Sequence, residues 1–365
     1  MKLRSIAAIL LTTSASTAFA GGFETNALST SFMYEDGSYA EIGYSSRSYD
    51  VKGTFYAPTG SALKDTTSIA FALKTNITDN LSIGLSSYNQ GTIQLDYSGA
   101  GATAPIPAAG LPVVDLPIDA KTLQAKYNVN ENISVLLGLK QAIVNDATAN
   151  IFQSGSLPAS TVTGKSEIGY ITGVAYSIPE FAFRAELLYE TDTDLSLITE
   201  NLGLGPAAAG TTTGSTPDYM TLNFQSGIAA DTLIFGSIRK ADWSNHQITV
   251  YPNQLFSAEP TSSFTDSVTY NVGIARKVSD SLSLIASYST EAAGDGTSET
   301  PLTITDGYKG VTLAARYTAG SATITAGYNH TQTGDISMTP GAGAPAGEFN
   351  NNTVTGFGIK VGFSF

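Results

Sequence analysis

Apolar and polar residues alternate along much of the chain, in runs of about ten residues. Successive side chains of a β-strand point to opposite faces of its sheet, so each run predicts a strand with one apolar face. Runs of this kind occur at 123–127, 220–224, 268–275 and 311–317. In the clearest run, which is the last, one face carries Phe357, Ile359, Val361, Phe363 and Phe365, and the other carries Gly358, Lys360, Gly362 and Ser364.

Two kinds of connection alternate between the predicted strands. Short turns rich in Asn, Asp, Ser and Gly lie at 76–81, 129–133, 178–181, 230–233, 278–282 and 319–323. Longer segments rich in Gly, Ala, Pro, Ser and Thr lie at 57–66, 99–118, 150–165, 198–217, 251–265, 292–308 and 336–350. Six turns and seven loops join fourteen strands, and short turns opposite long loops are typical of outer-membrane barrels. The sequence therefore predicts an all-β fold, a fourteen-stranded antiparallel transmembrane β-barrel over residues 39–365.

The start of the chain has the layout of a secretory signal peptide. A basic start, Lys2 to Arg4, precedes an apolar run at 6–11, and small residues at 18–20 precede Gly21. The apolar run is far shorter than the ~20 residues that a membrane helix needs. We therefore predict that residues 1–20 are a signal peptide and that the mature chain begins after them.

Charge is scarce in this chain and mostly negative. Charged residues make up 13% of the sequence, about half of the ~25% usual in soluble proteins, and the net charge is −13. The low share of charge favours a lipid-embedded barrel, and we predict a multi-pass protein of the Gram-negative outer membrane. Nucleic acid is excluded as a partner, because its phosphates require clustered Lys and Arg. The acidic residues of the loops are either simply solvated or bridged through divalent cations to lipopolysaccharide.

Aromatic residues stand just before several short turns and at the chain end, at Tyr127, Tyr176, Tyr317 and Phe365. Such girdles mark the membrane–water interface of a barrel. A terminal aromatic residue on an apolar strand face also resembles the signal that the outer-membrane barrel assembly machinery recognises. That machinery is therefore an expected partner through Phe365.

Catalytic motifs are scarce. The sequence has two histidines, His246 and His330, no cysteine, no Gly-x-Ser-x-Gly and no closely spaced set of metal ligands. Both histidines fall near the loop ends of predicted strands, where an ordinary solvated histidine is expected. We predict no enzyme activity, no cofactor and no metal. An outer-membrane lipase stays open as the enzymatic alternative, since its Ser and His need to be adjacent only in space.

Residues 21–38 precede the first predicted strand and carry apolar side chains that have no lipid face to join: Phe23, Leu28, Phe32 and Met33. A fourteen-stranded barrel has a lumen wider than eight-stranded barrels, whose interiors side chains can fill, so it needs a plug or it conducts. We interpret this segment as a luminal plug whose apolar residues contact a ligand. The alternative is a disordered periplasmic tail.

Strand parity assigns six cations to the barrel interior: Lys74, Lys126, Lys140, Arg184, Arg316 and Lys360. Buried charges need partners. On the structural interpretation these cations pair with acids of the wall and the plug, namely Glu167, Glu186, Glu24, Glu35 and Asp36. On the functional interpretation one or two of them, with Lys126, Arg184 and Arg316 as candidates, orient the carboxylate of an amphipathic substrate.

The third predicted strand contains a polar interruption. Leu81, Ile83 and Leu85 face lipid, and we expect the same parity to resume with Ile93, Leu95 and Tyr97. Between them fall Ser87, Asn89 and Gly91, which suggest a kink or bulge that interrupts pairing and opens the wall sideways. An ordinary bulge, or a stretch level with the outer headgroups, is the alternative.

Several short motifs resemble the FadL/TodX family of outer-membrane transporters for hydrophobic compounds. They span the mature chain and comprise 22–26 (Gly-Phe-Glu-Thr-Asn) with Ser29 and Ser31, 239–244 (Arg-Lys-Ala-Asp-Trp-Ser), 301–308 (Pro-Leu-Thr-Ile-Thr-Asp-Gly-Tyr) and the ending 349–365. The resemblance implies a fourteen-stranded barrel, an N-terminal hatch in the lumen, and lateral release of substrate beside a kinked third strand. The hatch segment is shorter than is typical of that family, and Asn-Pro-Ala does not occur in this sequence.

These features favour passive uptake of hydrophobic compounds, such as long-chain fatty acids, with exit through the wall near Gly91. A lateral exit spares an apolar substrate from a water-filled path. A general aqueous porin or small-solute channel is the main alternative, which requires a charged constriction and a continuous water column. A structural or adhesion barrel that acts through its loops is a third possibility.

Overall fold

A computed structural model describes residues 22–102, 113–145, 147–150, 160–200, 210–249, 262–300, 302–339 and 346–365. The predicted signal peptide, residues 1–20, lies outside the described residues. No helix in the described part of the chain is long and apolar enough to cross a membrane.

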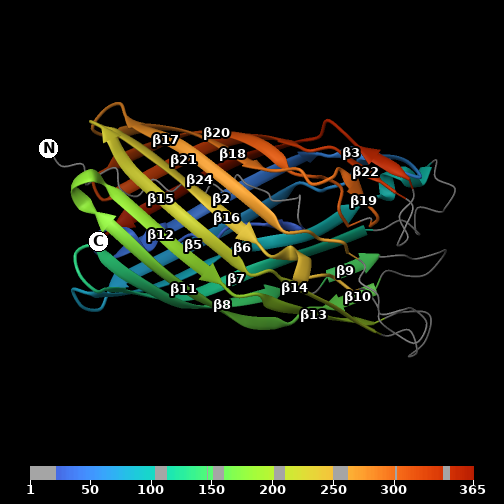
Figure 1. Cartoon of the computed structure of the whole chain (residues 1–365), viewed down its shortest axis with the longest axis horizontal. Helices are drawn as coiled ribbons and strands as arrows, with labels where there is room; N and C mark the ends of the chain where they lie inside the picture. Colours follow the sequence, from blue (N-terminus) through green and yellow to red (C-terminus); the bar gives the residue numbers. More distant parts are fainter. Residues whose placement is uncertain are drawn as a thin grey trace.

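The wall is a closed antiparallel β-barrel of fourteen strands, as the sequence predicted (Figure 1). Each strand pairs with the next along the wall, and β24 closes the barrel against β2, from Tyr39↔Ser364 to Asp50↔Thr353. The strands are β2 (Tyr39–Asp50), β5 (Thr66–Asn76), β6 (Leu81–Asp96), β7 (Val113–Asn128), β8 (Ile133–Val144), β11 (Ser166–Ile178), β12 (Phe183–Glu190), β15 (Tyr219–Ala229), β16 (Thr232–Ala241), β17 (Ser267–Lys277), β18 (Leu282–Glu291), β20 (Tyr308–Ala319), β21 (Ala322–Thr333) and β24 (Thr353–Ser364).

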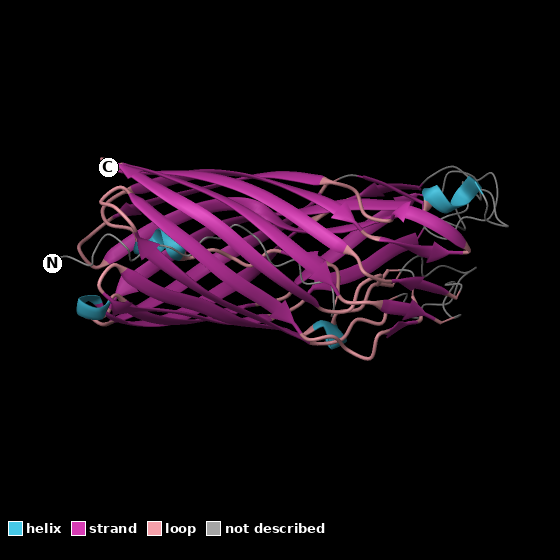
Figure 2. Cartoon of the chain, turned by 90° about the horizontal axis from the view of Figure 1, so that it is seen from above, coloured by secondary structure: helices cyan, strands magenta, loops and turns pink. Residues whose placement is uncertain are grey.

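The two ends of the barrel differ. Short turns join the strands at the end that carries the C-terminus, and long segments extend from the other end (Figure 2). The short-turn end holds the 3-10 helix η5 (Pro179–Phe181). The long segments contain β3 (Lys52–Phe55), β4 (Ala57–Ser61), β9 (Ala147–Asn150), β10 (Ser160–Thr163), β13 (Thr193–Glu200), β14 (Gly210–Thr216), β19 (Thr297–Ser298), β22 (Ile336–Met338), β23 (Gly347–Phe349), η3 (Ser98–Ala102) and η7 (Trp243–Asn245).

The outer face of the wall is apolar, because the alternation of each strand turns its large apolar side chains outward. On β17, for example, Tyr270, Val272 and Ile274 are exposed, whereas Thr269 and Ala275 are buried. The aromatic residues at the turn end are also exposed: Tyr127, Tyr176, Tyr317 and Phe365. A lipid-facing band flanked by aromatic residues has this arrangement.

One prediction of orientation was wrong. Ile93, Leu95 and Tyr97 do not resume the lipid-facing parity, since Leu95 and Tyr97 are buried within an interior apolar cluster. A β-bulge between Asn89 and Gly91 shifts the register of β6 against β7 by one residue. Because side chains alternate with a period of two, one extra residue moves the rest of the strand to the opposite face.

Candidate functional site

The described N-terminal segment, residues 22–38, lies inside the barrel. It contains β1 (Glu24–Thr25), which pairs with β6 at Thr25↔Gly91, and η2 (Ser31–Tyr34). At the turn end, Ser38 exchanges two backbone hydrogen bonds with Phe365. The apolar side chains of the N-terminal segment pack against lumen-facing side chains of the wall. They are at most 5% exposed, namely Phe23, Leu28, Phe32 and Met33.

A glycine of the wall makes room for η2. A methyl group added at Gly84 would overlap the sulfur of Met33 and lie 2.6 Å from Cε2 of Phe32. The wall and the N-terminal segment are therefore fitted to each other at this level. Neither a strand propensity nor a parity rule requires glycine at this position, so its close packing against Met33 accounts for it.

We expect Gly84→Ala to destabilise the packing of the N-terminal segment by about 1–3 kcal/mol, because it forces an extra methyl group into a filled space. Increased protease cleavage within the segment of the folded barrel would measure the effect. Gly43→Ala is the matched control, since its nearest neighbour would lie at an ordinary 3.7 Å. Equal protease resistance in both variants would contradict the proposed close fit.

The turn end of the segment is held by charged side chains of the wall. Two cations lie over the Tyr34 ring, with Nζ of Lys126 4.3 Å and Cζ of Arg184 3.9 Å from its centroid. The Tyr34 hydroxyl donates a hydrogen bond to Glu186 (2.7 Å), and the Thr30 hydroxyl donates another (2.6 Å). Glu186 is only 1% exposed, so these bonds satisfy a carboxylate that water does not reach.

The loop end of the segment is held by aromatic packing and by a third cation. The Phe23 ring contacts Trp243 edge to face with centroids 4.8 Å apart, and Trp243 is fully buried. Arg239 stacks its guanidinium 3.7 Å from the centroid of Tyr219 and donates a hydrogen bond to the Thr25 hydroxyl (3.3 Å). The segment is thus held at both of its ends.

Two further cations of the lumen pair with acids that the sequence analysis did not name. Lys140 lies 3.2 Å from Glu190, and both side chains are buried. Lys360 lies 2.9 Å from Glu41 on β2. Lys74 instead donates hydrogen bonds to backbone carbonyl oxygens of the N-terminal segment, at residues 35 and 37.

The strands β5 and β6 are not paired along their whole length, and we call the unpaired stretch of the wall the opening. Their pairing runs from Asn76↔Ser82 to Phe71↔Ser87 and ends there, although β5 still pairs with β2 as far as Thr66. A cavity of about 100 Å³ lies at this point. Its lining includes Phe32 and Glu41 from the interior, the outward-facing Tyr44, Phe71 and Ile359, and Ser68, Ser87, Asn89 and Asn26 at the margin.

On the side of the opening that faces the loop end, the N-terminal segment contacts β6 in place of β5. The Asn26 amide donates a hydrogen bond to the carbonyl oxygen of Asn89 (2.9 Å) and accepts one from Arg47 (2.7 Å). The backbone N–H of Asn26 donates to the carbonyl oxygen of Gln90 (2.7 Å). Beyond the bulge, β6 therefore pairs with β1 of the N-terminal segment in place of β5.

Solved structures of other proteins share this arrangement of strands. A FadL homologue from Pseudomonas aeruginosa aligns with a TM-score of 0.69 and 14% identity over 96% of each chain. The toluene transporter TodX of P. putida aligns with a TM-score of 0.66 and 13% identity over 91% of each chain. The toluene transporter TbuX of Ralstonia pickettii gives 0.60 and 10% over 96% of this chain and 97% of that chain.

The chain has the FadL/TodX fold. No protein-family model matches the sequence, and no curated protein matches it. The structural similarity therefore covers the whole barrel, although the sequence identity is too low for a sequence comparison to detect it.

Within the FadL/TodX fold of this chain, the three residues predicted to form the lateral opening separate into two groups. Ser87 and Asn89 line the cavity between β5 and β6. Gly91 is instead buried and pairs with Thr25. Their role in transport stays a prediction.

The three cations predicted to orient a substrate carboxylate lie at two different places in the lumen. Lys126 and Arg184 meet at Tyr34, whereas Arg316 is half-buried nearer to Glu35. Burial raises the pKa of the Glu35 carboxyl, and the charge of Arg316 opposes that shift. Glu190 and Glu41, which sequence reasoning missed, share the parity of other lumen-facing residues on their strands, so the signal for them was present.

Proposed function

We propose that this chain is a passive channel of the Gram-negative outer membrane for hydrophobic compounds, and that they leave through the wall into the bilayer. The single observation that carries the proposal is the cavity at the end of the β5–β6 pairing. Its lining combines interior residues such as Phe32 with outward-facing residues such as Phe71. A compound at this position can pass from lumen to lipid without entering the periplasm.

The proposed route is chemically suited to apolar compounds. An apolar molecule gains free energy when it leaves water, so a path that ends in lipid spares it a second exposure to water. The N-terminal segment acts in this proposal as the plug that blocks a straight aqueous path, since its buried side chains fill the lumen beside Gly84. The known structures of toluene transporters with the same fold support the same class of substrate.

The charged groups bear on the choice between neutral hydrocarbons and fatty acids. Lys126 and Arg184 already lie over the ring of Tyr34, and the charge of Glu186 already attracts Lys126, so the carboxylate of a fatty acid would compete with these interactions. This competition favours compounds without a charged head group. Long-chain fatty acids form the second class to be tested, and the proposal contains no catalytic step.

Two partners belong to the same proposal. Phe365 directly follows the closing strand and is 75% exposed, which suits recognition by the barrel assembly machinery. Acidic side chains at the loop end suit contact with lipopolysaccharide through divalent cations. Loss of outer-membrane insertion on deletion of Phe365 would test the first partnership.

Filling the opening tests the route. We expect Ser68→Leu with Ser87→Leu to slow uptake of toluene by about tenfold, which corresponds to a barrier raised by about 1.4 kcal/mol. Uptake of labelled toluene, and separately of a labelled long-chain fatty acid, would be measured in a host without its own transporter for either compound.

Thr67→Leu is the control, because Thr67 is exposed on the same strand and does not line the cavity. Uptake that is unchanged in the double variant would refute the lateral route. If cells with the unmutated protein took up no more of either compound than cells without it, the proposed transport itself would be refuted.

A further inference from the structure

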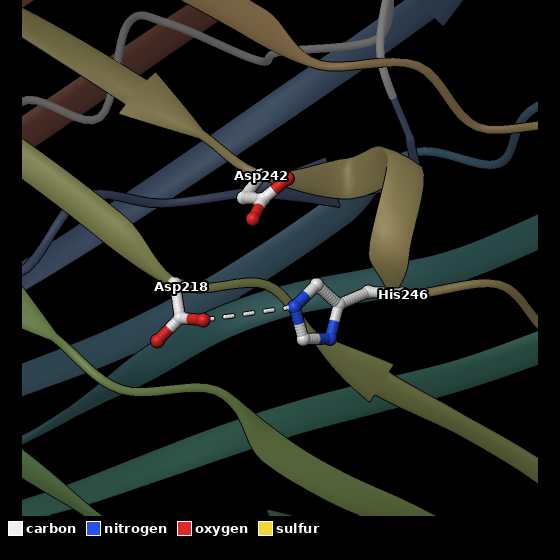
Figure 3. A group of neighbouring side chains, drawn as sticks. All are labelled: Asp218, Asp242 and His246. Carbon is white, nitrogen blue, oxygen red and sulfur yellow. Dashed lines mark ion pairs between the residues drawn. The ribbon is translucent and has the colours of Figure 1, made fainter.

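A group of potential metal ligands lies at the loop end of the barrel, away from the opening. Asp218, Asp242 and His246 each offer a ligand atom, and these atoms lie within 4.8 Å of one another. Figure 3 shows both carboxylates and the imidazole directed toward a common space. Residue spacing does not reveal this group, because strand pairing brings Asp218 to it from a distant position in the chain.

The backbone fixes the two carboxylates side by side. Asp218 directly precedes β15 and Asp242 directly follows β16, and the N–H of Asp242 donates a hydrogen bond to the carbonyl oxygen of Asp218 (3.1 Å). Like charges placed opposite each other across paired strands destabilise the sheet. The nearby ammonium of Lys240 is directed to another acid, Asp266, at 3.5 Å. A cation between the two carboxylates would remove the repulsion.

The imidazole of His246 is an independent indication of a ligand. The residue is only 9% exposed, and the Ser215 hydroxyl lies 2.6 Å from its Nδ1 and fixes the ring. Its Nε2 has no hydrogen-bond partner among the described residues and is directed at Oδ2 of Asp218, 3.8 Å away. That distance is too long for a hydrogen bond. Two ligands of one tetrahedral zinc ion lie about 3.3 Å apart, because each bond is about 2 Å long, so the two side chains need to approach by about 0.5 Å to share an ion.

Neighbouring groups orient both carboxylates through hydrogen bonds, as is usual for metal-binding carboxylates. Oδ1 of Asp218 accepts hydrogen bonds from the Tyr189 hydroxyl (2.7 Å) and from the N–H of Asp192 (3.1 Å). The carboxylate of Asp242 accepts two from the Asn245 amide (3.1 and 3.0 Å). Oδ2 of Asp218 accepts no described bond and faces the imidazole.

We propose that Asp218, Asp242 and His246 bind a divalent transition-metal ion of the zinc type. One imidazole nitrogen and two carboxylate oxygens suit Zn²⁺, whereas Ca²⁺ and Mg²⁺ prefer oxygen ligands throughout. Both aspartates are partly exposed, so water completes the coordination and a small rotation closes the 4.8 Å spread. The ion clamps the turn η7, which carries Trp243 against Phe23 of the N-terminal segment.

Equilibrium dialysis of the folded full-length protein, without a histidine tag, tests the site. We expect one Zn²⁺ per chain at a free concentration of about 10 µM, and an affinity lower by about tenfold to a hundredfold in His246→Ala and in Asp218→Asn. His330→Ala is the matched control, because the chain has only these two histidines. Heat-modifiable migration in gels identifies the folded fraction of each variant.

A second measurement uses the only tryptophan of the chain. Co²⁺ in the site should quench the emission of Trp243, and His246→Ala should abolish that quenching while His330→Ala retains it. Equal zinc binding by the two histidine variants would overturn the proposal. Binding of Ca²⁺ or Mg²⁺ as tight as that of Zn²⁺ would overturn it as well, and so would the absence of bound zinc at about 100 µM free ion.

Discussion

Replacing Lys140 by methionine should lower the free energy of unfolding of the barrel by about 3–5 kcal/mol. The side chain of Lys140 is 0% exposed, and that of its partner Glu190 is 3% exposed, with Nζ and Oε2 3.2 Å apart. Removal of the lysine leaves a carboxylate buried without its counter-ion, and the cost of that isolated charge is the source of the large effect. Urea-induced unfolding in detergent, followed by Trp243 emission, would measure it.

A surface pair provides the control for this prediction. The ammonium of Lys240 lies 3.5 Å from Asp266, but the two side chains are 56% and 38% exposed. Lys240→Met should therefore cost at most about 1 kcal/mol. Removing both buried charges, by Lys140→Met with Glu190→Gln, should restore much of the lost stability. Equal costs for Lys140→Met and Lys240→Met would show that burial does not determine the strength of the pair.

The Lys140–Glu190 pair shows which features of the lumen the sequence could predict. The period of two assigned Lys140 to the interior, and Glu190 stands four positions after Glu186 on the same strand and therefore on the same face. Pairing still depends on which strands become neighbours and in which register, and β12 lies beside β11 rather than β8. A single sequence fixes the face of a side chain but not its partner across the lumen.

The bulge in β6 shows where the alternation of side chains stops predicting their orientation. Leu81 to Leu85 obey the alternation, and the bulge between Asn89 and Gly91 falls within the polar gap that follows. The extra residue at Gln90 is invisible to a period of two, so the orientations predicted for Leu95 and Tyr97 were wrong. A bulge is set by its partner strand, and one strand read alone does not reveal it.

The contacts at the loop end could not be predicted from the sequence. Asp242 and His246 are close in the chain, but Asp218 joins them only because β15 pairs with β16. The edge-to-face contact of Phe23 with Trp243 likewise joins residues that are far apart in the chain. Their apolar character was evident, whereas their meeting depends on the depth to which the N-terminal segment enters the lumen.

Releasing the N-terminal segment should convert the closed barrel into an ion-conducting one. Thr30 and Tyr34 both donate hydrogen bonds to the buried Glu186, at 2.6 and 2.7 Å. Hydrogen bonds to a charged group contribute about 1.5–3 kcal/mol each, so Thr30→Val with Tyr34→Ala should weaken the attachment by about 3–6 kcal/mol. That loss raises the population of the released segment by a factor of about 10²–10⁴. Single-channel recordings in planar bilayers would detect the resulting currents.

The control for release lies in the same segment. The Ser29 hydroxyl contacts that of Ser31, within the segment, so Ser29→Ala should leave the barrel closed. A double variant that remains closed and resists protease would show that Glu186 does not hold the segment in place. Large, stable currents from the unmutated protein would have a wider consequence, because an open aqueous path would favour a general porin over a channel for hydrophobic compounds.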